Sequence, residues 1–380
     1  MVTVPLTALA VVIGSAGVLT VLGSVRRGST AAAATGRGLA VWAALATVGL
    51  AVVLAVAVFG SLRTFGVMHY AYLVATVSLP MVGLSAAAAS WRSRPAVPSD
   101  LRRRVAGGLA IAVMLLPAVV GFYATHIEPH WLRVDHVTVA VGGERQGDDP
   151  VTVGVLADLQ TNHVGDHERN AVDSLVEAEP DVILIPGDLF HGDDDEYARE
   201  LEAMRGLLAR LHAPHGVYLV QGDADPPEWM ARMIAGTDIT VLDRDVVDLE
   251  IGDRRLRLGG HTLHPSGWDA EVVRNDLQQT TDPGVITVLL AHRPDTALYL
   301  PEGSRVDLTV AGHTHGGQIV VPGIGPLLTL SDVPRDVARG GLHRMDGNQI
   351  YVSPGVGIER GDAPQVRLFN RPAVAILTLR

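Results

Sequence analysis

The chain of 380 residues contains no cysteine, which excludes disulfide bonds and thiolate metal ligands. Its charge is unevenly divided: residues 1–128 hold nine arginines against two acids, net +7, and the remainder holds 21 arginines against 39 acids, net −18. An acidic C-terminal part without a basic stripe argues against nucleic acid as a partner, and against a domain that lies flat on anionic lipid.

The first 130 residues contain four long apolar stretches, at about 4–23, 39–60, 67–89 and 105–124. Each approaches the roughly 20 residues that a helix needs to cross the hydrocarbon core of a bilayer. The stretches lack the polar face that helices have when they pack in a soluble domain. A cleavable signal peptide would carry a basic residue before its apolar stretch, and no basic residue precedes the first stretch here. We therefore expect an all-α region of four transmembrane helices at 1–130, in a multi-pass protein of the cell membrane, and a soluble domain at 131–380.

Arginines in the loops predict the orientation of these helices. The loops after the first and third stretches hold eight arginines, namely Arg26, Arg27, Arg37, Arg92, Arg94, Arg102, Arg103 and Arg104. The loop after the second stretch holds only Arg63. Because basic loops stay in the cytoplasm, both arginine-rich loops are expected inside. Everything after about Ile127 is then expected to be extracytoplasmic.

Beyond residue 150, short apolar runs that predict buried strands alternate with segments of helical spacing. Helices are expected at 169–178, 193–211 and 229–235, and the later strands at 238–242, 246–251, 255–260, 305–311, 349–353 and 373–379. This alternation predicts an α/β domain.

Five of the apolar runs end in a carboxylate or an imidazole. The runs and the side chains that follow them are 151–157 with Asp158, 182–186 with Asp188, 216–220 with Asp223 and Asp225, 285–290 with His292, and 308–311 with His313 and His315. In an α/β domain such strand ends converge on one rim of a sheet. Histidine is the commonest side-chain metal ligand, so the pair His313 and His315 indicates a metal site. The alternative is a polar turn that binds no ligand.

These motifs resemble those of the calcineurin-like metallophosphoesterases, which carry Asp-x-His, Gly-Asp, Gly-Asn-His-Asp/Glu, a lone His and Gly-His-x-His in this order. The corresponding segments here are Asp158-Leu-Gln160, Gly187-Asp188, Gly222-Asp223-Ala224-Asp225, His292 and Gly312-His313-Thr314-His315. The resemblance covers roughly residues 151–379 and is strongest to the bacterial membrane-associated branch. It implies a sandwich of two sheets flanked by helices.

The resemblance also implies two divalent ions. Carried over by motif, Asp188 bridges the ions, and Asp158, Gln160 and His315 hold one of them. The remaining motif residues, Asp223, His292 and His313, hold the other. Two such ions can polarise a phosphoryl group and activate a hydroxide for in-line attack.

Gln160 stands where the family has His, and it can ligate through its amide oxygen. Oxygen in place of nitrogen favours Mn²⁺, with Mg²⁺, Fe²⁺ and Zn²⁺ as further candidates. The alternative is that Gln160 no longer touches an ion.

The third motif departs from the family at two positions. Asp223 in place of Asn adds a carboxylate, which lowers the net charge of the two-ion centre from +2 to +1 when all three carboxylates are ionised. Ala224 removes an imidazole that commonly protonates the leaving group, and His163 is a candidate substitute acid or an ordinary loop histidine. Arg293 and Arg360 are candidate contacts for an anionic substrate, or solvated surface residues.

Two functions follow from these motifs. The first is a membrane-anchored phosphoesterase that hydrolyses a phosphodiester, a phosphomonoester or a pyrophosphate, with an envelope component among the candidate substrates. The second is a degenerate pseudo-enzyme that retains metal for structure or binding. The retained His292, the histidine pair and the three carboxylates favour the first, and the two lost motif histidines keep the second open.

Overall fold

The computed structural model describes residues 3–59, 64–92, 101–142 and 147–380. The chain divides into two compact units: unit 1 is Met1–His126 with Arg360–Gln365, and unit 2 is Ile127–Glu359 with Val366–Arg380. The domain boundary expected at residue 130 stays a prediction. Arg63 and Arg94, which entered the orientation argument, lie outside the described residues.

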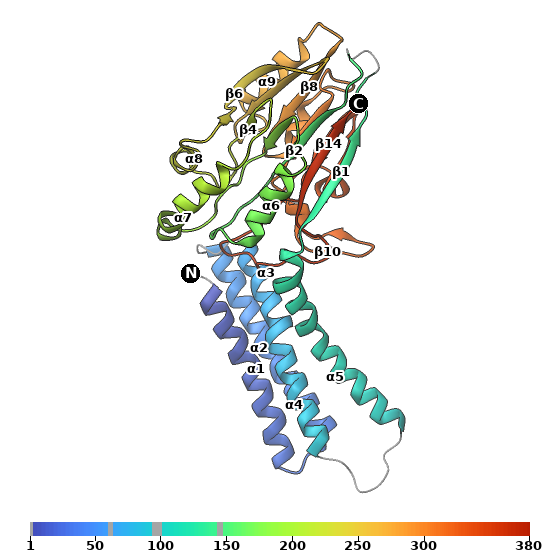
Figure 1. Cartoon of the computed structure of the whole chain (residues 1–380). Helices are drawn as coiled ribbons and strands as arrows, with labels where there is room; N and C mark the ends of the chain where they lie inside the picture. The colour runs from blue at the N-terminus through green and yellow to red at the C-terminus, as the bar shows by residue number, and fades with distance from the viewer. Residues whose placement is uncertain (1–2, 60–63, 93–100, 143–146) are drawn as a thin grey trace. The chain divides into compact units, whose positions relative to one another are not determined.

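Unit 1 is helical (Figure 1). Its helices are α1 (Thr3–Arg26), α2 (Ala31–Phe59), α3 (Thr64–Leu73), α4 (Leu79–Arg92) and α5 (Leu101–Phe122). One π-helical turn, η1 (Val74–Ser78), joins α3 to α4, and another, η2 (Tyr123–Ile127), follows α5. Among the described residues, four segments are long and apolar enough to cross a membrane: Pro5–Arg26, Ala31–Val58, Phe65–Arg92 and Arg104–His130. Four apolar helices of spanning length, as expected, therefore fit a membrane protein.

The π-helical turn η1 ends two residues before Pro80, which lies in the third span. A proline within a helix removes one backbone N–H and crowds the carbonyl four residues earlier. Local π-helical geometry and hydroxyl side chains relieve that conflict. The π-helical turn supplies the first of these here, and two of its hydroxyls bond to the backbone: Ser78 donates to the Val74 carbonyl at 2.8 Å, and Thr76 donates to the Tyr72 carbonyl at 2.7 Å. Neither acceptor is the Thr76 carbonyl, which Pro80 crowds.

Unit 2 contains two six-stranded sheets. The first has the order β1-β14-β2-β3-β4-β5. Its strands are β1 (Arg133–Val139), β14 (Ala373–Leu379), β2 (Val151–Val155), β3 (Val182–Ile185), β4 (Val217–Leu219) and β5 (Ile239–Val241). The second has the order β12-β13-β9-β8-β7-β6. Its strands are β12 (Gly341–Met345), β13 (Asn348–Val352), β9 (Leu308–Ala311), β8 (Val285–Leu290), β7 (Arg254–His261) and β6 (Arg244–Ile251).

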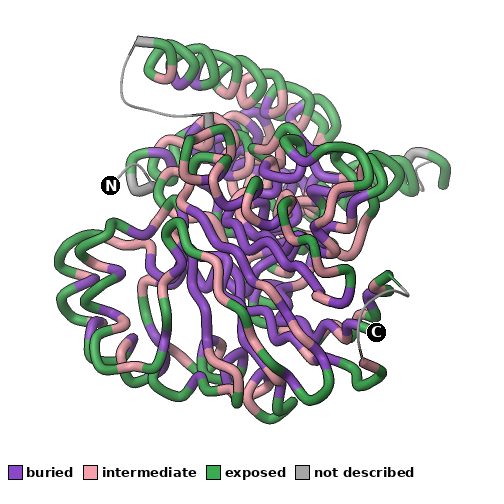
Figure 2. Tube along the Cα trace, turned by 90° about the horizontal axis from the view of Figure 1, so that it is seen from above, coloured by how far each residue is buried: buried purple, intermediate pink, exposed green. Residues whose placement is uncertain are grey.

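The two sheets pack face to face through one apolar core. Val153 and Leu184 of the first sheet share this core with Leu258, Val288 and Val310 of the second. All five residues are buried, and Figure 2 shows the buried parts of the chain in purple. The expected two-sheet α/β sandwich is therefore confirmed.

Helices cover the outer faces of the sandwich. The helices α6 (Asp166–Val176), α7 (Asp194–Leu208) and α8 (Pro227–Met233) pack on the first sheet, and α9 (Trp268–Gln278) packs on the second. Smaller elements are α10 (Arg335–Ala338), the hairpin of β10 (Val320–Val321) and β11 (Gly325–Pro326), and the 3₁₀ turns η3 (Glu128–His130), η4 (Pro294–Tyr299) and η5 (His315–Gly317). The sequence patterns missed the strands β1, β10, β11 and β12 and the helices α9 and α10. The strand expected from residue 305 begins only at Leu308.

Parallel pairing places the functional residues. The strands β2, β3 and β4 run parallel, with Val155 beside Leu184 and Leu184 beside Tyr218. The strands β8 and β9 of the other sheet also run parallel, with Leu290 beside Val310. The segments that leave the carboxyl ends of these five strands therefore emerge at common sheet edges, where α/β folds build their sites.

Candidate metal centre

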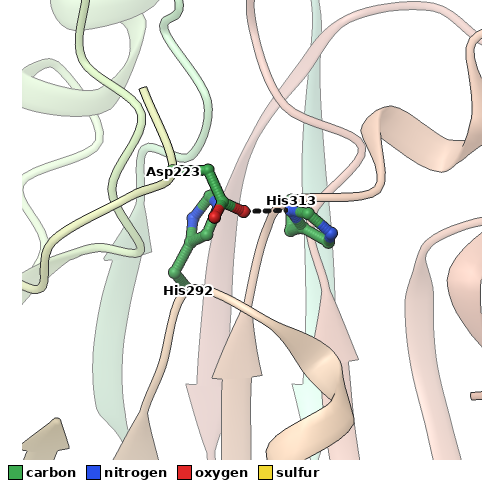
Figure 3. Close-up of side chains that lie close together, drawn as sticks. All are labelled: Asp223, His292 and His313. Atoms are coloured by element: carbon green, nitrogen blue, oxygen red, sulfur yellow. Dashed lines mark ion pairs between the residues drawn. The ribbon is translucent and has the colours of Figure 1, made fainter. Parts of the chain in front are cut away.

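Six of the seven expected ligands lie in two compact groups. Ligand atoms of Asp223, His292 and His313 lie within 4.8 Å of one another, and those of Asp158, Asp188 and His315 do the same. Figure 3 shows the first group, with the Asp223 carboxylate turned towards His313. The Asp223 Oδ2 lies 2.9 Å from the His313 Nδ1 and 3.3 Å from the His292 Nε2.

His292 belongs to the first group and also lies next to the second. Its Nε2 faces Asp223 of the first group and lies 3.6 Å from the Asp188 Oδ2 of the second. Its Nδ1 lies 2.7 Å from the Pro186 carbonyl and 3.9 Å from the Asp158 Oδ1. Asp188 therefore stands next to a member of the other group, as a bridging carboxylate must.

The backbone around the ligands is strained. Of the ten non-glycine residues with positive φ in the described part of the chain, six lie in the metal-centre loops: Asp158, Gln160, Asp188, His313, His315 and Gln318. Such conformations cost of order 1 kcal/mol or more each and persist only where the surroundings enforce them. Because six of these strained residues lie in the metal-centre loops, the surrounding structure must enforce the conformation of these loops.

Asp225 enforces the conformation of the Gly187–Asp188 loop. Its buried carboxylate accepts hydrogen bonds from the backbone N–H groups of Asp188, Leu189 and Gly222, at 2.7, 2.8 and 3.1 Å. The loops approach so closely that a Cβ on Gly222 would lie 2.1 Å from the Asp188 nitrogen. A glycine is therefore required at this position.

The Pro354–Gly357 segment folds over Asp158 from the end of β13. The N–H of Gly357 donates to the Asp158 carbonyl at 2.7 Å. The fully buried guanidinium of Arg367 holds this segment by donating to the carbonyls of Pro354, Gly355 and Gly357. Burial lowers the pKa of Arg367 to about 9, and the nearby Asp158 carboxylate opposes that shift.

A second clamp supports His315 from behind. The buried carboxylate of Glu128, on η3, accepts from the backbone N–H groups of Phe369 and Asn370 at 2.9 and 2.6 Å. The Asn370 side-chain amide then donates to the His315 carbonyl at 2.6 Å. The position of this expected ligand therefore depends on residues far away in the sequence.

The clustered carboxylates of the site favour the binding of positive charge. Burial raises the pKa of Asp158 to about 7. Burial lowers the pKa of His292, but Asp188, Asp223 and Asp158 outweigh it and raise the value to about 10. Burial also opposes ionisation of Asp223, yet its close contacts with His292, His313 and Arg293 hold the pKa of Asp223 well below the usual range. Clustered carboxylates that attract protons in this way equally favour metal cations.

The imidazole orientations fit metal ligation. His292 turns Nδ1 to the Pro186 carbonyl and Nε2 to the carboxylates, while His313 turns Nε2 to the Leu330 carbonyl and Nδ1 to Asp223. Ligating histidines characteristically hold one nitrogen with such a backbone partner. Neither ring nitrogen of the buried His315 makes a hydrogen bond within the described part of the chain, and burial keeps its pKa far below the usual value. A neutral imidazole with an available nitrogen is what an ion requires, so the donor set fits divalent cations.

Gln160, the seventh expected ligand, is buried beside the second group. Its amide nitrogen donates to the His191 Nδ1 at 3.0 Å and lies 3.5 Å from the Glu359 Oε2. Glu359 Oε2 in turn lies 4.0 Å from the His315 Nε2. Ligation by Gln160 stays a prediction, and these contacts orient its amide.

Sequence reasoning missed Glu359 and Arg367 as neighbours of the site, and it considered no link between His191 and Gln160. One signal could have found Glu359: the strand expected at 349–353 is followed by the glycine-rich Pro354-Gly-Val-Gly357, another strand end at the same rim. The buried Arg367 carries no comparable pattern.

His163 lies in a different environment from the six grouped ligands. Its side chain is 73% exposed, and its Nδ1 lies 3.0 Å from the Glu200 Oε1 on α7. The catalytic role of His163 stays a prediction. Arg293, in contrast, lies at the site, with Nε and Nη2 at 3.0 and 2.5 Å from the two carboxylate oxygens of Asp223.

Comparisons with known proteins agree with this geometry. A family model described as calcineurin-like phosphoesterase matches residues 151–317. The uncharacterized metallophosphoesterase YkuE of Bacillus subtilis is 27% identical, over 73% of this chain and 97% of its own. The phosphodiesterase YaeI of Escherichia coli is 26% identical, over 68% of this chain and 92% of its own. A transmembrane protein with metallophosphoesterase domain from Danio rerio is 30% identical, over 58% of this chain and 43% of its own.

Proposed function

We propose a dinuclear mechanism at this metal centre. The chain belongs to the calcineurin-like phosphoesterase family and is a metal-dependent phosphoester hydrolase. The substrate is a phosphodiester, phosphomonoester or pyrophosphate, with an envelope component as the favoured source. Family membership favours this enzyme over the metal-binding pseudo-enzyme. The four apolar helices anchor it in a membrane, and its acidic unit 2 supports the absence of nucleic acid among its partners.

One observation carries the proposal: two ligand groups lie side by side and Asp188 joins them. Asp188 belongs to one group and lies 3.6 Å from His292 of the other. Two divalent ions, when bound, would lower the pKa of a water molecule and polarise the phosphoryl oxygens. Asp158, Gln160 and His315 would hold one ion, Asp223, His292 and His313 the other, and Asp188 both.

The chain's own residues orient these groups. Asp225 accepts from the backbone N–H of Asp188 at 2.7 Å. The backbone N–H of Ala224 donates to the Asp188 Oδ1 at 2.6 Å and so orients the bridging carboxylate. The Ala224 side chain offers no proton donor to a leaving group. The enzyme should therefore hydrolyse aryl esters faster than esters with poor leaving groups, because a general acid matters only where the departing oxygen needs a proton.

Substitutions at the ligands test the bridge. Asp188→Ala should lose both ions, whereas His313→Ala and His315→Ala should each lose one, because only Asp188 serves both groups. Metal content is measured by elemental analysis of the purified full-length protein, and turnover is measured with an aryl phosphodiester. Mn²⁺ should support faster turnover than Zn²⁺ because Gln160 offers oxygen.

Asp166→Ala is the control, because this carboxylate is 97% exposed on α6. It should keep two ions per chain and full turnover. Two ions per chain in Asp188→Ala would refute the bridge, and absence of hydrolysis with any divalent ion would refute the proposed activity.

A further inference from the structure

Asp223 carries one more negative charge than the asparagine of the family's third motif. If Asp158, Asp188 and Asp223 are all ionised, a centre of two dications keeps a net charge of +1 instead of +2. Less positive charge means weaker attraction for the anionic phosphoryl group. A cation close to Asp223 would offset this extra negative charge.

Arg293 is placed to be that cation. Its Nε donates to the Asp223 Oδ2 at 3.0 Å, and its Nη2 donates to the Oδ1 at 2.5 Å. The planar guanidinium thus matches the carboxylate as a fork, the strongest geometry for an Arg–Asp pair. The Oδ2 atom still faces His313 Nδ1 at 2.9 Å, so the same carboxylate contacts both the cation and the ligand group.

Side-chain contacts of the residues before and after Arg293 hold its backbone in place. His292, before it, is fixed by the contact of its Nδ1 with the Pro186 carbonyl. Asp295, two residues after it, accepts from the Ser331 hydroxyl at 2.8 Å and from the Asp332 N–H at 2.7 Å. The guanidinium therefore approaches Asp223 from an anchored segment at the start of η4.

We propose that Asp223 and Arg293 act together as one neutral ligand unit, in which Arg293 is a positioning residue that directs the Asp223 carboxylate to the ion and cancels its extra charge. This inference rests on the proposed dinuclear function. It restores the charge of the centre to that of a site with asparagine at this position. It also assigns Arg293 a partner within the protein in place of the direct substrate contact that its position after His292 equally allows.

A double-mutant cycle distinguishes these two roles. The four proteins are wild type, Arg293→Gln, Asp223→Asn and the double variant, all as full-length chains loaded with Mn²⁺. The probe is inorganic phosphate, measured as a competitive inhibitor and by calorimetry. Arg293→Gln should weaken phosphate binding about tenfold or more, as expected when one member of a close charge pair is removed. The double variant should recover most of that loss, because a neutral residue 223 needs no compensation.

Metal content of the four proteins separates this inference from the function on which it rests. If wild type fails to retain two ions, the dinuclear function fails before the cycle is considered. If wild type retains two ions but the double variant binds phosphate as weakly as Arg293→Gln, charge compensation is refuted and Arg293 contacts the phosphate directly. Arg339→Gln is the control, because it removes one exposed arginine and should change phosphate affinity less than twofold.

Discussion

At the scale of single residues, Asp225 holds the backbone of the expected metal ligand Asp188, although Asp225 is not itself an expected ligand. Its carboxylate satisfies three backbone N–H groups from two loops, those of Asp188, Leu189 and Gly222. Hydrogen bonds to a charged acceptor contribute about 1.5–3 kcal/mol each, and buried donors left without a partner add a desolvation cost.

Asp225→Ala should therefore lower the free energy of unfolding of unit 2 by about 3–5 kcal/mol. Denaturant titration of the detergent-solubilised protein, followed by tryptophan fluorescence, measures the loss. Asp225→Asn keeps one carbonyl acceptor and should lose less. A change below about 1 kcal/mol in the alanine variant would show that the loop is fixed by other contacts.

The residue scale also shows what a sequence can predict about a site. Asp158, Asp188, Asp223, His292, His313 and His315 were predictable as neighbours because each follows an apolar strand, and parallel strands bring such ends together. Arg367 was not predicted, because it follows an irregular segment whose path depends on tertiary hydrogen bonds. Glu359 was also missed, although it follows the end of a predicted strand, because several residues separate it from that end. The extra negative charge of Asp223 was predicted from the sequence. Its ion pair with Arg293 was not, because no spacing rule links residues 223 and 293.

At the scale of elements, the end of β7 carries a buried histidine with a consequence for pH. His261 Nε2 lies 2.9 Å from the Thr296 hydroxyl of η4, and Nδ1 lies 2.6 Å from the Thr262 carbonyl. Burial lowers the pKa of His261 to about 4 from its usual 6.5. Between these values the unfolded chain binds a proton that the folded chain does not, so stability increases with pH across this window.

His261 should therefore contribute stability that is fully present above pH 6.5 and lost as the pH falls towards 4. Each pKa unit corresponds to 1.36 kcal/mol, so the loss is about 3 kcal/mol. Because other groups also titrate, the measurement is the difference in free energy of unfolding between wild type and His261→Gln at several pH values. A difference that does not change between pH 7 and 4 would contradict the assignment.

The elements that the sequence did not predict are those with weak hydrophobic signals. The strand β1 lies at an edge of its sheet, so most of its side chains are exposed or half-buried and its apolar pattern is short. The helix α9 buries Ala270, Val273, Arg274 and Leu277 at helical spacing, but one of these four positions is an arginine. The central strands, buried on both faces, give continuous apolar runs and were predicted with small errors at their ends.

At the scale of the whole molecule, the predicted orientation of the transmembrane helices determines the side of the membrane on which unit 2 lies. We propose that unit 2 is extracytoplasmic, because eight arginines lie in the first and third loops and only one in the second. A fluorescent protein that matures only in the cytoplasm, fused after Arg380, should therefore stay dark in intact cells. The same reporter fused after Arg27 should be bright and serves as the control. Bright fluorescence from the fusion after Arg380 would place unit 2 inside.

The clamp at Glu128 has a consequence for protein engineering. A hydropathy plot invites a cut after Trp131 to release the enzyme from its helices. That cut would remove the carboxylate that holds Phe369 and Asn370, and through Asn370 the backbone of His315. Glu128, which follows the last helix, thus helps to hold the metal centre, and a fragment that keeps this centre intact has to include Glu128.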